Sequence, residues 1–132
     1  MFSHTMLGTN DLDRAEAFYD ALVPALGGEK FFRTETAVYW EFGDGGFKLA
    51  LTLPFDGNPA CVGNGVMVAF SVGSRDVVDT LHATALAMGG TDEGIPGDRN
   101  AGIYYGAYFR DPDGNKISIY VINSPPEGES RH

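Results

Sequence analysis

The sequence predicts an α+β fold made of two successive modules, each with the element order β-α-β-β-β. Two segments of helical periodicity alternate with short apolar stretches that are typical of strands. Each helical segment ends at a pair of glycines, Gly27-Gly28 and Gly89-Gly90, and a turn-forming segment follows in each half, at residues 43–46 and 111–114. Such an internal repeat predicts two similar units that form a curved sheet, with helices on the convex side and a cavity on the concave side.

The first module is expected over about residues 1–54. A strand at 2–9 leads to an N-cap at Asn10 or Asp11, and Pro24 is expected to fray the last turn of the following helix. Three strands are expected at 30–34, 37–42 and 47–53, with the turn 43–46 joining the last two. The buried stripe of the helix is predicted as Leu12, Ala15, Tyr19, Leu22 and Leu26.

The second module is expected over about residues 66–124, after a Gly- and Pro-rich linker at 55–65. A strand at 66–72 precedes a helix that Ser74 caps, and short strands follow near 91–95, 103–110 and 115–122. Residues 125–132 are polar and are expected to form a loose tail. The buried stripe of this helix is predicted as Val77, Val78, Leu81, Ala85 and Met88.

Composition excludes several classes of function. A chain of 132 residues with 43% hydrophobic and 20% charged residues predicts one globular domain. Its net charge of −9 disfavours nucleic acids and anionic membranes as partners. The first residues lack the pattern of a secretory signal, so a cytoplasmic location is expected. The one cysteine, Cys61, allows no intrachain disulfide, and a small molecule or another protein remains as the partner.

Three segments of the sequence resemble the vicinal oxygen chelate superfamily of glyoxalases, bleomycin-resistance proteins and extradiol dioxygenases. The resemblance implies paired βαβββ modules in one domain and, commonly, a homodimer. In the enzymes of the family, a divalent metal binds to side chains on the first and last strands of each module. The three segments are FSHTMLGTNDLDRAEAFYDALVPALG, GNGVMVAFSVGSRDVVDTLHATALAMGGTDEGIPGDR and YYGAYFRDPDGNKISIY.

The resemblance places the four metal positions at His4, near Ala50, at Met67 and at Ser118. Family enzymes usually have histidine where Met67 stands and glutamate where Ser118 stands, so only His4 matches. A thioether suits soft copper(I), and a neutral hydroxyl is a weak ligand. We therefore expect no metal and no other cofactor, and we favour a metal-free His4 that lines the cavity over a metal-binding one.

Pairing across the two hairpins gives a list of residues that face the cavity. Four-residue turns at 43–46 and 111–114 would pair Phe42 with Phe47 and Arg110 with Asn115. Since the resemblance places Ser118 at the site, its face is taken as the cavity face, and Trp40 then faces the helices. A slip of one residue would exchange the two faces. The predicted lining is His4, Met6, Tyr39, Glu41, Lys48, Ala50, Thr52, Met67, Ala69, Tyr105, Ala107, Phe109, Ser118 and Tyr120.

Several of these residues have two possible roles. Glu41 is either a general base or, as we favour, the partner of Lys48 across the hairpin, and Lys48 could instead bind an acidic ligand. Arg99 is expected in a loop at the cavity edge, where it could bind a carboxylate or remain solvated. Met67 fills space in either case. Four aromatic residues form either a stacking platform or ordinary packing: Tyr39, Tyr105, Phe109 and Tyr120.

Two functions are consistent with these observations. The first is a metal-free protein that binds a flat or partly apolar small molecule in the concave cavity, as bleomycin-resistance members do. The second is an enzyme of the glyoxalase or dioxygenase type with an altered or absent metal centre. In that case His4 would be the general base, because its ordinary pKa lies near neutrality, and Glu41 would be the runner-up.

Overall fold

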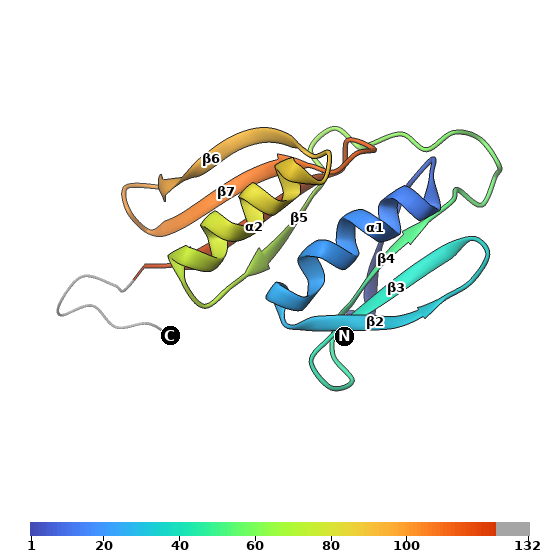
Figure 1. Cartoon of the computed structure of the whole chain (residues 1–132), viewed down its shortest axis with the longest axis horizontal. Helices are drawn as coiled ribbons and strands as arrows, with labels where there is room; N and C mark the ends of the chain where they lie inside the picture. The colour runs from blue at the N-terminus through green and yellow to red at the C-terminus, as the bar shows by residue number, and fades with distance from the viewer. Residues whose placement is uncertain (124–132) are drawn as a thin grey trace.

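The computed structural model describes residues 1–123, and within that part of the chain the βαβββ order occurs twice, as the sequence predicts (Figure 1). The predicted tail at 125–132 lies outside the described residues. Within residues 1–123, no helix is long and apolar enough to cross a membrane. The first module contains β1 (His4–Gly8), α1 (Leu12–Leu22), β2 (Gly28–Arg33), β3 (Ala37–Phe42) and β4 (Lys48–Thr52). The second contains β5 (Met67–Ser71), α2 (Arg75–Ala87), β6 (Thr91–Arg99), β7 (Tyr104–Arg110) and β8 (Lys116–Ile122).

Both helices begin at the residues that the sequence predicts. The Asp11 carboxylate accepts a hydrogen bond from the Arg14 backbone N–H at 3.0 Å, and the Ser74 hydroxyl accepts one from the Val77 N–H at 3.2 Å. A short 3₁₀ helix, Val23–Leu26, replaces the last turn predicted for α1, because Pro24 cannot donate the backbone hydrogen bond of an α-helix. The buried stripe of α2 includes His82, which the sequence analysis left out.

Each module forms a four-stranded sheet of the same design. The strand order is β1-β4-β3-β2 in sheet A and β5-β8-β7-β6 in sheet B, and each first strand runs parallel to the last strand of its own module. The strand predicted at 91–95 is longer than expected, because β6 continues to Arg99 through two irregularities in its pairing with β7. One face of each sheet is covered by a helix, and we call the other its open face.

A single hydrophobic core extends beneath both helices, which lie next to each other on the same side of the two sheets (Figure 1). Phe18 of α1 and Phe109 of β7 contact each other within it, with ring centroids 6.1 Å apart. Trp40 is 1% exposed and faces the helices, so the prediction for its side of β3 is confirmed.

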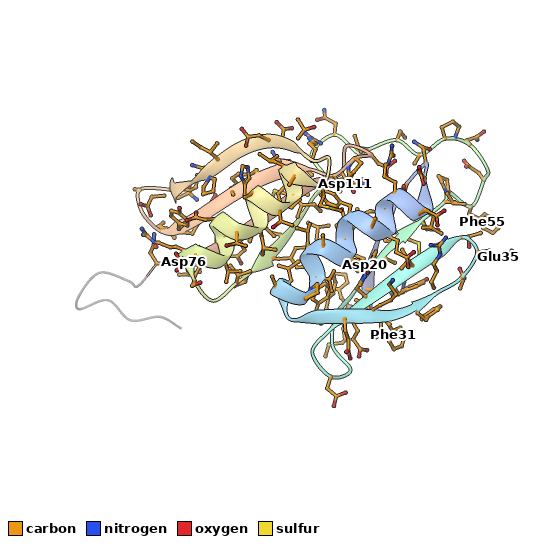
Figure 2. All side chains as sticks on the ribbon, in the orientation of Figure 1. Asp20, Phe31, Glu35, Phe55, Asp76 and Asp111 are labelled. Carbon is orange, nitrogen blue, oxygen red and sulfur yellow. The ribbon has the colours of Figure 1, made fainter. Side chains whose placement is uncertain are left out.

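Polar contacts join the turn between β7 and β8 to the first module. The buried Asp111 carboxylate, labelled in Figure 2, accepts a hydrogen bond of 2.6 Å from the hydroxyl of Tyr19 in α1. The Asp113 carboxylate accepts hydrogen bonds from the Thr9 hydroxyl at 2.6 Å and the Arg14 guanidinium at 2.7 Å. The Asn115 side-chain amide donates to the carbonyl of Gly8 at 2.9 Å. These contacts fix the position of one module against the other.

Candidate functional site

The open face of sheet B carries different aromatic residues from those predicted, because the β7–β8 hairpin is shifted by one residue. The Asp111 N–H donates to the Asn115 carbonyl at 2.9 Å, so a three-residue loop closes the hairpin instead of the four-residue turn that we expected. Gly114 makes this loop possible, since its φ of +95° suits a turn followed by a bulge. Arg110 therefore pairs with Lys116, and Tyr108 pairs with Ser118.

The shift corrects the prediction for Tyr105, Ala107 and Phe109, which lie on the helix side of sheet B. Phe109 and Ala107 are fully buried in the core. The Tyr105 hydroxyl donates to the Asp79 carboxylate of α2 at 2.6 Å, which raises the pKa of this phenol. The Arg75 guanidinium lies 4.7 Å from the centroid of the Tyr105 ring. None of the three is placed to contact a ligand on the open face.

Three tyrosines gather on the open face of sheet B. Tyr104 and Tyr120 meet edge to face with ring centroids 5.8 Å apart, and the hydroxyls of Tyr104 and Tyr108 share a hydrogen bond. That hydrogen bond is the main reason that the pKa of Tyr104 lies above its usual value, so its phenol is neutral at physiological pH. A cavity of about 210 Å³ lies here, and it is lined by Met67, Ala69, Tyr104, Tyr108, Ser118 and Tyr120.

Of the predicted site residues, Met67, Ser118 and Tyr120 thus come together, whereas Tyr104 and Tyr108 were missed. Arg99 ends β6 rather than lying in a loop, and the centre of its guanidinium is 5.7 Å from the Tyr108 ring centroid. The Lys116 ammonium is 5.4 Å from the centroid of the same ring. Lys116 was not among the predicted site residues.

The open face of sheet A holds the other predicted residues. The register of β3 against β4 is as predicted: Tyr39 pairs with Ala50 and Glu41 with Lys48. Glu41 also pairs with Lys48 as expected, since its carboxylate lies 3.4 Å from the Lys48 ammonium. The exposed His4 ring meets Tyr39 edge to face at 5.7 Å, and its Nδ1 is 2.9 Å from the Ser3 hydroxyl.

A bulge in β2 adds two aromatic residues to sheet A that the sequence analysis missed. Its pairing with β3 shifts between Lys30 and Phe32, so that Phe31 and Phe32 both contact residues of the open face. Phe32 stacks on Tyr39 with ring centroids 4.6 Å apart, and the Lys48 ammonium lies 5.0 Å from the Phe31 centroid. A cavity of about 490 Å³ lies beside them, and its lining includes Met6, Phe32, Thr36, Tyr39, Thr52 and Phe55.

The side chains at the four metal positions of the resemblance do not fit a hard or borderline divalent cation. They offer one imidazole, one methyl group, one thioether and one hydroxyl, from His4, Ala50, Met67 and Ser118. Within residues 1–123, no group of three or more His, Cys, Asp or Glu side chains could hold a metal ion. His82, inside α2, is buried, and its Nε2 is 2.9 Å from the Asp92 carboxylate. It therefore does not add a ligand to the four metal positions.

Comparison with known proteins identifies the family. The profile of the glyoxalase/bleomycin resistance protein/dioxygenase superfamily matches residues 1–119. A glyoxalase/bleomycin resistance protein from Albidiferax ferrireducens is 39% identical, with a TM-score of 0.85 over 93% of this chain and 99% of that chain.

More distant solved structures share the fold. A glyoxalase-related enzyme from Fulvimarina pelagi is 23% identical, with a TM-score of 0.75 over 98% of this chain and 95% of that one. A lactoylglutathione lyase from Agrobacterium tumefaciens is 24% identical, with a TM-score of 0.67 over 92% of each chain. No curated protein matches the sequence. The profile match over most of the chain and the similarity to the Albidiferax protein show that this chain belongs to the glyoxalase/bleomycin resistance protein/dioxygenase superfamily.

Proposed function

We propose that this protein binds a flat, partly apolar small molecule without a metal, on the open face of sheet B. The observation that carries the proposal is the group of Tyr104, Tyr108 and Tyr120 around a cavity of about 210 Å³. Aromatic side chains on a concave surface favour planar ligands, because they bury a large apolar area and still offer polar hydroxyls. The part of the cavity lining that the structure describes is apolar or phenolic and offers no carboxylate or imidazole, which favours binding of a partly apolar ligand.

Replacing Tyr108 by alanine is expected to weaken binding by roughly 1–3 kcal/mol if the ligand covers this ring. A thermal-shift screen of planar compounds would supply ligands, and isothermal titration calorimetry would compare their affinities. Tyr105→Ala is the matched control, because Tyr105 lies on the same strand but faces α2. Equal binding of every screening hit to Tyr108→Ala and to the unmodified protein would exclude the tyrosine group as the binding site.

The same proposal predicts that the purified protein holds no stoichiometric transition metal. The expected content by elemental analysis, after purification without chelator, is far below one ion per chain. About one tightly held zinc, nickel, manganese or iron ion per chain would overturn this prediction, because tight binding needs several well-placed donor side chains.

Catalysis on sheet A is the second candidate, and the exposed His4 imidazole beside Tyr39 favours it. His4 would be the general base, with Glu41 less suited because it already pairs with Lys48. Turnover of a hemithioacetal, catechol or small α-keto acid that resists chelator and is lost in His4→Ala would support this alternative. A homodimer and a cytoplasmic location remain predictions, which size-exclusion chromatography with light scattering and cell fractionation would test.

A further inference from the structure

The duplicated fold allows each position of one open face to be compared with its counterpart in the other. In sheet A, the backbone pairing aligns His4, Lys48 and Glu41 across three neighbouring strands. In sheet B, the same pairing aligns Met67, Lys116 and Arg110. Lysine occupies the central position in both sheets. The residue that pairs with it on the antiparallel strand is an acid, Glu41, in sheet A and a base, Arg110, in sheet B.

This exchange changes the charge around the two lysines. The Lys48 ammonium lies 3.4 Å from the Glu41 carboxylate. Arg110, which stands where Glu41 stands in sheet A, instead donates to Glu93 of β6 at 2.5 Å. Within residues 1–123, no carboxylate lies within ion-pair distance of Lys116. The open face of sheet B therefore keeps a positive charge that sheet A neutralises.

A second cation, Arg99, lies near the same tyrosine ring as Lys116, that of Tyr108. The guanidinium of Arg99 and the ammonium of Lys116 are 5.7 Å and 5.4 Å from the centroid of Tyr108. Arg99 donates one hydrogen bond, to the Ile95 carbonyl at 2.5 Å, and the described residues give it no carboxylate partner. Every other lysine and arginine within residues 1–123 pairs with a carboxylate: Arg14, Lys30, Arg33, Lys48, Arg75 and Arg110.

Two glycines allow the tyrosine rings and Arg99 to lie close against the backbone of sheet B. Gly97 of β6 and Gly106 of β7 are direct partners in the backbone pairing. A Cβ atom on Gly106 would lie 3.0 Å from the Tyr104 ring and 3.2 Å from the Cβ of Tyr120, and one on Gly97 would lie 3.2 Å from the Arg99 guanidinium. A side chain at either position would therefore displace the tyrosine rings or the Arg99 guanidinium, so the two glycines keep these groups in their present places.

We infer that the site on sheet B recognises a planar molecule that carries a carboxylate or a similar anionic group, an inference that rests on the proposed function. The rings of Tyr104, Tyr108 and Tyr120 contact the planar part, and Arg99 and Lys116 bind the anion. A guanidinium with unused N–H groups suits a carboxylate, because it can donate two parallel hydrogen bonds. The chain has a net charge of −9, so most of its surface repels an anion. Arg99 and Lys116, to which the described residues give no carboxylate partner, attract an anion at this site.

The experiment uses two probes of nearly equal shape, naphthalene-2-carboxylate and its neutral amide, naphthalene-2-carboxamide. We expect the carboxylate to bind about tenfold more tightly at low salt, because hydrogen bonds to charged groups exceed those to neutral ones by roughly this factor. Lys116→Gln and Arg99→Gln should each weaken carboxylate binding by about tenfold and leave amide binding unchanged. Added salt should weaken binding of the carboxylate only.

Lys48→Gln is the matched control. It removes the same charge from the corresponding position of sheet A, and binding of both probes should stay as in the unmodified protein. Equal affinity for the two probes, with both weakened by Tyr108→Ala, would overturn the anion inference and leave the proposed function standing. Binding of neither probe to the unmodified protein would count against both. Loss of carboxylate binding in Lys48→Gln would also overturn the assignment to sheet B.

Discussion

Replacing Trp40 by alanine is expected to lower the free energy of unfolding by about 3–5 kcal/mol. The side chain is 1% exposed and lies against Tyr19, with ring centroids 5.5 Å apart. Its indole N–H donates to the Asp20 carboxylate of α1 at 2.9 Å. The substitution therefore removes a large buried ring between β3 and α1 and leaves a cavity. Urea denaturation followed by circular dichroism would measure the loss, because Trp40 is the chain's one tryptophan and its fluorescence disappears with it.

Trp40→Phe serves as the control for this prediction. It keeps an aromatic ring in the core and loses only part of the buried area and one hydrogen bond, so a smaller loss of stability is expected. Because Trp40 faces the helices, binding at the open face of sheet B should be unchanged in any variant that remains folded. A decrease of less than about 1 kcal/mol for Trp40→Ala would contradict the packing described, since deletion of a buried tryptophan side chain costs several times more.

Asp111→Ala is expected to lower the free energy of unfolding by about 3 kcal/mol, because it breaks a buried, charged hydrogen-bond network. The Asp111 carboxylate accepts from the Tyr19 hydroxyl at 2.6 Å, from the Asn115 side chain at 3.0 Å and from two backbone N–H groups at 2.9 Å. Burial raises the pKa of Asp111, and these hydrogen bonds oppose that effect. Burial also raises the pKa of Tyr19, so its phenol keeps the proton that it donates.

Asp44→Ala is the matched control, because Asp44 lies exposed in the corresponding turn of the first module and its loss should change stability by less than about 0.5 kcal/mol. A double-mutant cycle with Tyr19→Phe would isolate the contact between the modules. We expect the two substitutions to be non-additive, because each removes the same hydrogen bond. Full additivity would mean that Asp111 stabilises only its own turn.

The sequence predicted the order of the elements, both helix caps and one hairpin register correctly, and the reasons are local. Asp11 and Ser74 act on backbone groups a few residues away, and the turn 43–46 closes on Phe42 and Phe47 as expected. The predicted register of the second hairpin was wrong by one residue, because residues 111–114 can form either a four-residue turn or part of a three-residue loop with a bulge. The positive φ of Gly114 decides between them, and a sequence pattern does not report it.

The missed residues of the site follow from that shift and from irregular strands. The shift put Tyr104 and Tyr108, rather than Tyr105 and Phe109, on the open face of sheet B. The bulge in β2 brought Phe31 and Phe32 to the face of Tyr39. Bulges depend on how a strand fits its neighbours, so alternating hydrophobicity does not reveal them. The predicted register also turned Tyr108 away from the open face, so its ring was not placed beside the Lys116 ammonium, which lies 5.4 Å from the ring centroid.

The hydrogen bonds between the β7–β8 turn and the first module should couple the unfolding of the two modules. Thr9, Arg14 and Tyr19 reach the second module directly, across a separation of about ninety residues or more along the sequence. The segment between β4 and β5 connects the modules covalently, but these contacts and the shared core hold them in place. Local opening of the turn would thus weaken α1 as well, and we expect the two halves of the duplication to unfold as one cooperative unit.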